Sequence, residues 1–272
     1  MRTGSIEIID PESDLFVSLT SGGSGAIMLG QHVLAAAPIP ENGLDRLSDG
    51  PLELETERGS LAVEIESSGE PIVLKGELTG RREARLARIT GELIEGDRTI
   101  ELDCPGVIHS RDGSAAASGL SREVTIVLSD GGLICAATAR QPGSKRHSAE
   151  EAVAAISHPG GYIEFDQVLL STEYDTAGRQ RRATLELWPA SEEVAALHGA
   201  GTVISGCTAK VGPARINTAL FRWALDGHTG LGRYEIRTES GQSAGSEPEQ
   251  AGAGKAGAGV GVNEAEAPEA AA

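Results

Sequence analysis

The sequence has few of the residues that cross-linked and metal-dependent proteins use. Its three cysteines are Cys104, Cys135 and Cys207, and no two of them have CxxC spacing. This argues against a disulfide framework or a zinc site, and each cysteine lies in an apolar stretch, where it acts as a small buried side chain. No HxH or HExxH pattern is present either. We therefore expect neither a metal nor a cofactor.

Long hydrophobic runs are also absent. No stretch of about 18 apolar residues could form a membrane-spanning helix, and residues 1–4 lack the apolar core of a secretory signal. These absences predict a cytoplasmic protein. Acidic residues outnumber basic residues by 40 to 23, which gives a net charge of -17. Such a surface repels phosphate backbones and anionic lipid, so nucleic acid and membranes are not expected partners.

Aromatic residues make up only 3% of the chain, so the wall of any ligand cavity must be mainly aliphatic. Two motifs of nucleotide or ester chemistry are missing as well. The glycine-rich residues 21–25 precede an apolar strand pattern and not the helix that a phosphate loop requires. No GxSxG sequence is present, which argues against an α/β-hydrolase.

What the sequence does contain is alternation of apolar and polar residues, for example at 61–66 and 183–187. A period of two places alternate side chains on opposite faces of a β-strand. Turn signals such as Asp130-Gly131 and Asp226-Gly227 separate the alternating segments and favour tight hairpins. The pattern predicts an all-β protein, either an antiparallel calycin- or lipocalin-like barrel or two packed β halves. Strands are expected near residues 5–9, 14–20, 25–36, 51–57, 60–66, 71–78, 83–95, 98–103, 122–129, 132–140, 161–174, 181–188, 201–209, 214–225 and 232–238.

Two short helices and a change of composition complete the expected organisation. Residues 148–151 form a capping box ahead of an alanine-rich run, and Ser191-Glu192-Glu193 favours a second helical turn. We expect both to be loop helices. A stretch of small residues at mid-chain predicts a boundary between an N-terminal β half (1–115) and a C-terminal half (116–238). Residues 239–272 have almost no large apolar side chains, so we expect a disordered acidic tail.

The segment from Phe221 to Glu235 resembles the closing hairpin of the carotenoid 1,2-hydratases (hydroxyneurosporene synthases) and their lipocalin-like relatives. Those proteins tend to end in a tryptophan strand, an Asp-Gly turn and a Gly-x-Gly return strand with an acidic residue. Trp223, Asp226-Gly227, Gly230-Leu231-Gly232 and Glu235 match that order. A second similarity is the mid-chain group His109, Arg111 and Asp112, although the relatives' tryptophan is missing there. The resemblance implies a calycin-like barrel, or a pair of barrels.

The same resemblance implies a chemistry. In the hydratases an acidic residue is thought to protonate a carbon–carbon double bond, after which water adds. His109, Asp112 and Glu235 are the candidates for acid/base roles, with Arg111 beside them as a ligand contact. The alternative for residues 111–113 is an ordinary turn, because Arg-Asp-Gly is common in hairpins.

Three further residues are candidates for ligand contacts. Tyr162 and Glu164 lie on one expected strand, where Glu164 and Asp166 share a face and could converge in a cavity; the alternative is a solvent-facing row. Trp223 is either a core anchor or the aromatic contact of an apolar ligand.

Three functions remain open from the sequence. The first is a lipocalin-like protein that binds a small apolar molecule. The second is a hydratase or isomerase acting on an isoprenoid-like substrate by acid/base chemistry. The third is a non-catalytic scaffold domain.

Overall fold

A computed structural model describes residues 2–20, 26–29, 32–35, 50–56, 59–112, 119–144, 150–159, 161–191 and 194–239. The described residues form sixteen β-strands in two antiparallel sheets and contain no helix. The all-β prediction is therefore confirmed. The predicted boundary between residues 115 and 116, and the tail beyond residue 239, lie outside the described residues.

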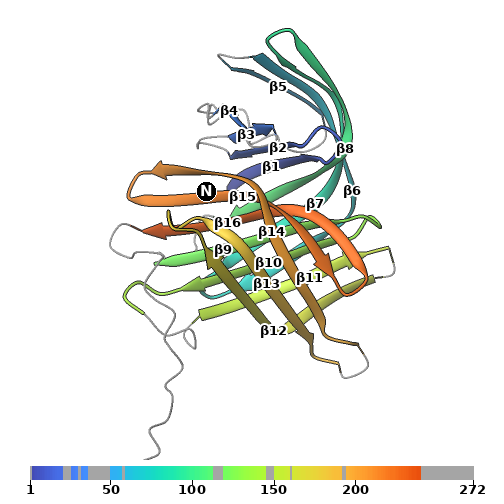
Figure 1. The fold of residues 1–272 in the computed structure, drawn as a ribbon. Helices are drawn as coiled ribbons and strands as arrows, with labels where there is room; N and C mark the ends of the chain where they lie inside the picture. Colours follow the sequence, from blue (N-terminus) through green and yellow to red (C-terminus); the bar gives the residue numbers. More distant parts are fainter. Residues whose placement is uncertain are drawn as a thin grey trace, which may run out of the picture.

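The first sheet is open and has eight strands in the order β4-β3-β2-β1-β8-β7-β6-β5. Strands β1 and β8 pair at its centre, so the beginning of the chain lies beside residues 106–112. This sheet forms the upper half of Figure 1. Its strands are β1 (Arg2–Asp10), β2 (Leu15–Thr20), β3 (Ala26–Leu29), β4 (His32–Ala35), β5 (Gly50–Thr56), β6 (Gly59–Gly76), β7 (Gly80–Glu95) and β8 (Arg98–Asp112).

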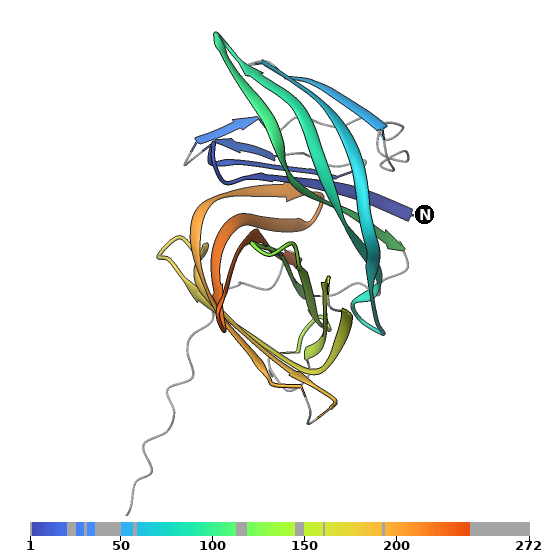
Figure 2. The ribbon, with the colours of Figure 1, turned by 90° about the vertical axis from the view of Figure 1, so that its right-hand side faces the viewer.

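The second sheet is a closed barrel whose eight strands follow one another up and down, with β9 pairing with β16 to close the ring. Closed eight-stranded barrels of this kind are the architecture of lipocalins. Figure 2 shows the ring lying below the open sheet. Its strands are β9 (Leu120–Leu128), β10 (Leu133–Arg140), β11 (Glu150–His158), β12 (Gly161–Tyr174), β13 (Gln180–Pro189), β14 (Leu197–Val211), β15 (Ala214–Leu225) and β16 (His228–Glu239).

Alternation along the strands produces three layers of apolar side chains. One row of the open sheet, which includes Ile6 and Ile89, forms a core on the face turned away from the barrel. The opposite row, which includes Val107, packs on outward-facing barrel residues such as Leu133. A third cluster fills the inside of the barrel. The two sheets are thus packed together, and both faces of the open sheet are partly covered.

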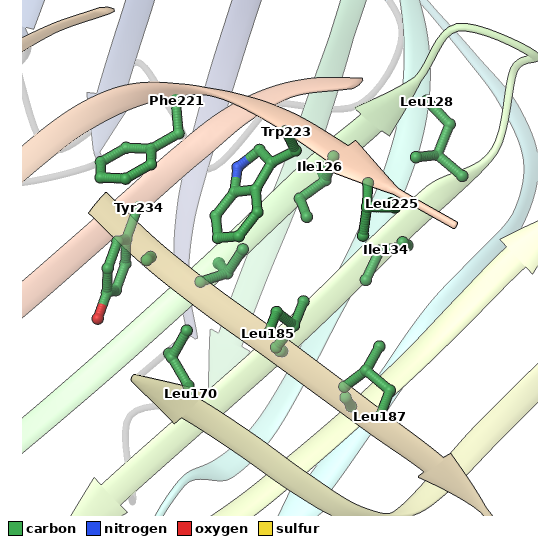
Figure 3. Close-up of a cluster of buried hydrophobic side chains, with 14 of the residues drawn as sticks. Ile126, Leu128, Ile134, Leu170, Leu185, Leu187, Phe221, Trp223, Leu225 and Tyr234 are labelled. Carbon is green, nitrogen blue, oxygen red and sulfur yellow. The ribbon is translucent and has the colours of Figure 1, made fainter. Parts of the chain in front are cut away.

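The inside of the barrel is occupied by large side chains. The rings of Phe221 and Trp223 lie 5.6 Å apart, and Tyr234 meets Phe221 edge to face. Figure 3 shows these rings among leucine and isoleucine side chains. Gly201 makes room for the rings of Phe221 and Trp223, because a Cβ on Gly201 would lie 2.9 Å from each of them. Gly232 has a different role, since a Cβ there would lie 1.7 Å from the Thr125 carbonyl oxygen. The Gly-x-Gly sequence of the closing hairpin therefore lets β16 approach β9.

The prediction of a helix after the capping box is wrong, because Glu150–His158 is strand β11. This strand is covered on both sides: Ala154 faces the barrel interior and Ala155 faces the open sheet. A strand buried on both faces is a continuous apolar run, which periodicity cannot distinguish from a helix. Glu192 and Glu193 of the second expected helix lie outside the described residues, and Leu197 already begins β14.

The break expected between residues 66 and 71 is also not a turn. Strand β6 continues through it with a register shift against β7 between Ser68 and Ile72, and Gly69 has a φ of 70°. Gly69 therefore marks an irregularity in one long strand. At the Asp226-Gly227 signal, where φ is 22° and 92°, the expected hairpin between β15 and β16 is confirmed.

A single carboxylate fastens the barrel to the turn between β6 and β7. Glu151 on β11 accepts hydrogen bonds from the backbone N–H groups of Glu77, Leu78 and Thr79, at 2.6, 2.8 and 2.7 Å. Burial alone would raise the pKa of Glu151, but these hydrogen bonds hold that pKa below its ordinary value. The carboxylate thus stays charged and satisfies three donors of the other sheet.

We predict that Trp223→Ala will lower the free energy of unfolding by about 3–5 kcal/mol, because it removes a fully buried ring from the barrel. The control is Trp188→Ala, since Trp188 is only half-buried and should cost clearly less. Urea denaturation of the three proteins measures both effects. Equal losses for the two variants would contradict a packed barrel interior.

Candidate functional site

A cavity of about 400 Å³ lies between the open sheet and the outer wall of the barrel. Part of its wall is aliphatic, with Ile72 and Leu74 from β6 and Ala137 and Ile216 from the barrel. The rest is strongly polar and includes His109 and several arginine and glutamate side chains. Cavities that combine an apolar wall with a few polar groups are the usual form of small-molecule sites.

Glu7 of β1 is the most deeply buried charged group beside this cavity, with only 1% of its side chain exposed. One of its oxygens lies 2.7 Å from His109 Nε2 and 2.5 Å from Arg233 Nε. These contacts are short but are not aligned as hydrogen bonds, so charge attraction is the main interaction between Glu7 and Arg233. Glu7 and His109 belong to the open sheet and Arg233 to the barrel, so this pairing crosses the interface.

Glu123 of β9 also links the two sheets, but here the carboxylate belongs to the barrel and two of its arginine partners to the open sheet. Its carboxylate meets Arg82 of β7 and Arg111 of β8, and also lies 3.5 Å from Arg233. Arg82 and Arg111 are directly opposite on paired strands, so two like charges share this carboxylate. Glu235 completes the network at 2.7 Å from Arg233. Three glutamates and three arginines thus form one continuous cluster across the two sheets.

Electrostatics keep the buried glutamates ionised. Burial alone would raise the pKa of Glu7, but Arg233 and His109 outweigh it and hold that pKa below its ordinary value. Burial alone would also raise the pKa of Glu123, but Arg111, Arg82 and Arg233 hold that pKa well below 4.5. Both groups are therefore carboxylates at neutral pH, and neither can serve there as a proton donor.

The two cysteines on the cavity wall are poor nucleophiles. Burial raises the pKa of the Cys135 thiol, and Glu7 adds to the effect. Burial also raises the pKa of Cys207, with a further contribution from Glu235. Since the thiolate is the reactive form, these side chains act as apolar wall.

The structure brings three of the seven residues selected from the sequence to the cavity. His109, Arg111 and Glu235 all line it. Asp112 does not line it: this side chain is about half exposed and lies 3.8 Å from Arg81.

The other three lie elsewhere on the barrel. Trp223 is in the barrel interior, 1% exposed. Tyr162 and Glu164 are exposed on β12, where the Tyr162 hydroxyl contacts Glu164 and donates to the Val73 carbonyl.

Sequence reasoning missed Glu7, Arg82, Glu123 and Arg233. Glu7 carries a recognisable signal, because it is a single carboxylate in the apolar run Ile6-Glu7-Ile8-Ile9. The other three sit in alternating strands among many charged residues. Their pattern is that of a solvent-facing row, and only the docking of the second sheet covers them.

No group of three or more histidine, cysteine, aspartate or glutamate side chains is arranged to hold a metal ion among the described residues. The described segments also include no helix of the length and hydropathy needed to cross a membrane.

Known structures share this architecture. A protein from Nitrosomonas europaea provisionally described as AttH aligns with a TM-score of 0.60 at 14% identity, over 88% of this chain and 91% of its own. Kievitone hydratase from Nectria haematococca gives 0.54 at 12% identity, over 88% of both chains. A protein named CghA gives 0.57 at 12% identity, over 89% of this chain and 88% of its own. The sequence matches no protein-family model and no curated protein.

These similarities establish the two-sheet fold. Identities of 12–14% are too low to show a shared function. One of the three structures is a hydratase by name. The similarity to carotenoid 1,2-hydratases, which rests on the closing hairpin, stays a prediction.

We predict that Glu123→Gln will lower the free energy of unfolding by about 3–5 kcal/mol at pH 7, because it leaves buried arginines without their carboxylate. The native pKa of Glu123 is depressed, so its stabilisation is complete above its ordinary pKa of 4.5 and is lost as the pH falls below that value. The parent protein should therefore lose stability below about pH 4.5 more steeply than the variant.

Urea denaturation at a series of pH values measures this difference. The matched control is Glu64→Gln, an exposed glutamate on β6, which should change little at any pH. Parallel profiles for the parent and Glu123→Gln would show that the cluster contributes no stability.

Proposed function

We propose that the protein binds a small, largely apolar molecule in the cavity between its two sheets. The observation that carries this proposal is the cavity itself, which joins an aliphatic wall to a fixed cluster of charged groups. The sequence left two roles open for Trp223, which lies inside the barrel: a core anchor or the aromatic contact of an apolar ligand. Leucine, isoleucine and aromatic side chains occupy that space, so the inter-sheet cavity is the better candidate.

The polar part of the wall would set the ligand's orientation. Its side chains are anchored from both sheets, since Arg233 of β16 contacts Glu7 of β1 and Glu123 of β9 contacts Arg82 of β7. Groups held in place before binding lose little conformational entropy when a ligand arrives. An apolar body on the aliphatic wall, with its polar atoms toward this cluster, uses both parts of the cavity.

The first test uses N-phenyl-1-naphthylamine, an uncharged probe that fluoresces in apolar surroundings. Ala209→Phe places a ring in the cavity wall and should weaken probe binding by about tenfold or more, because a filled cavity no longer accepts the probe. Ala224→Phe puts the same ring on an exposed barrel position and should leave binding unchanged. Equal affinities in the two variants would place the probe outside this cavity.

A second candidate function, a hydratase or isomerase, is favoured by the Glu7–His109 pair. The ionised Glu7 carboxylate lies 2.7 Å from Nε2 of the imidazole, and proton exchange would use Nδ1, the other ring nitrogen. In a hydration, protonated His109 would give its proton to one carbon of a double bond. Water would then bond to the other carbon and return a proton to the imidazole, so the net change is addition of one water.

This second function predicts incorporation of solvent hydrogen at carbon. Isoprenoid alkenes incubated with the protein in deuterium oxide should gain deuterium, as detected by mass spectrometry. His109→Gln should abolish the incorporation and preserve the affinity for N-phenyl-1-naphthylamine, because a general base contributes about 10²–10⁴-fold to rate and little to apolar binding. If no alkene gains deuterium, this second function fails, and if the variant retains the exchange, His109 is not the proton donor.

A further inference from the structure

We infer that the ligand of the inter-sheet cavity carries an anionic oxygen group, which Arg111 and Arg237 recognise. This inference rests on the proposed binding function and adds a ligand class to it. It follows from the balance of charges and donors at the cavity wall.

The first argument is charge. Four arginines line the cavity, namely Arg82, Arg111, Arg233 and Arg237. The carboxylates available to them are those of Glu7, Glu123 and Glu235. Glu83 also lines the cavity and is paired with Arg81. Four glutamates therefore accompany the four arginines, but none of them is paired with Arg237 among the described residues.

The second argument is hydrogen bonding. Glu123 accepts hydrogen bonds from Arg111 and Arg233 and also meets Arg82, and Glu235 accepts one from Arg233. The acceptors of these two glutamates are thus heavily used. Arg111 contacts Glu123 through a single nitrogen, and about a third of its side chain is exposed. A guanidinium has five N–H donors, so several donors of Arg111 remain available to a ligand.

Arg237 strengthens this argument. It lies two residues beyond Glu235 on the same face of β16 and lines the cavity, but it has no ion-pair partner among the described residues. A half-buried arginine beside a cavity gains most from an anion, because a planar guanidinium fits a carboxylate or a similar group with two parallel hydrogen bonds. A ligand with a positive charge would instead meet Arg111 and Arg237 and be repelled.

The experiment compares two probes with the same aromatic body. Anilinonaphthalene sulfonate carries one anionic group, and N-phenyl-1-naphthylamine lacks it. The sulfonate should bind about ten- to hundredfold more tightly to the parent protein, which corresponds to one or two charge-assisted hydrogen bonds. The preference should fall as the salt concentration rises, because ions screen exposed charges.

Arg111→Gln and Arg237→Gln should each remove most of the preference for the sulfonate. Arg237→Gln breaks no ion pair among the described residues, so it tests recognition without disturbing the buried cluster. The matched control is Arg222→Gln, an exposed arginine on the outer face of β15, which should retain the preference. Thermal denaturation of each variant checks that it is folded.

Three results would overturn the inference. If both probes bind the cavity equally well, the ligand need not be anionic, and the proposed binding function still stands. If the sulfonate preference survives in the variant lacking both Arg111 and Arg237, the anion is recognised elsewhere. If neither probe responds to Ala209→Phe, the binding function itself fails and this inference fails with it.

Discussion

The buried ion cluster between the sheets is the constraint on which the arrangement of the molecule depends. Moving a charged side chain out of water costs several kcal/mol, and only close partners of opposite charge offset it. Glu7 and Arg233 come from different sheets, as do Glu123 and Arg82. Any other docking of the sheets would leave one of these groups buried without its partner. The cluster therefore selects one relative position, and that position creates the cavity.

Side-chain size explains why the barrel interior is filled and the cavity between the sheets is open. An eight-stranded barrel is just wide enough for its own side chains to fill or for one small ligand to occupy. Here Trp223, Phe221 and Tyr234 take that space, and Gly201 leaves room for the first two of these rings. Between the sheets the facing residues include Ala84 and Ala137, which are too small to close the gap beside the long charged side chains. The room for a ligand consequently lies outside the barrel.

Shared architecture does not by itself give this protein an activity, because one fold carries many functions. The three structural neighbours are 12–14% identical to it, and the argument for binding comes from the cavity wall. His109, Arg111 and Glu235 were selected from the sequence as site candidates, and all three line the cavity, although Glu235 lies more than 120 residues from the other two. The selection rested on the motifs of a family resemblance. Glu123 and Arg233 have no such motif and could be found only when the sheets were docked.

The sequence by itself determined the all-β class, the positions of most strands and the Asp226-Gly227 hairpin, because a two-residue period and turn chemistry are local properties. It misread β11, where burial on both faces removes the alternation. Only the tertiary structure decided which outward-facing rows are buried. Glu123 on β9 and Glu64 on β6 follow the same alternating pattern, but the first is enclosed by three arginines and the second faces solvent. The charges and the two-residue period of a strand can be read from its own sequence. Its burial depends on the surface that packs against it.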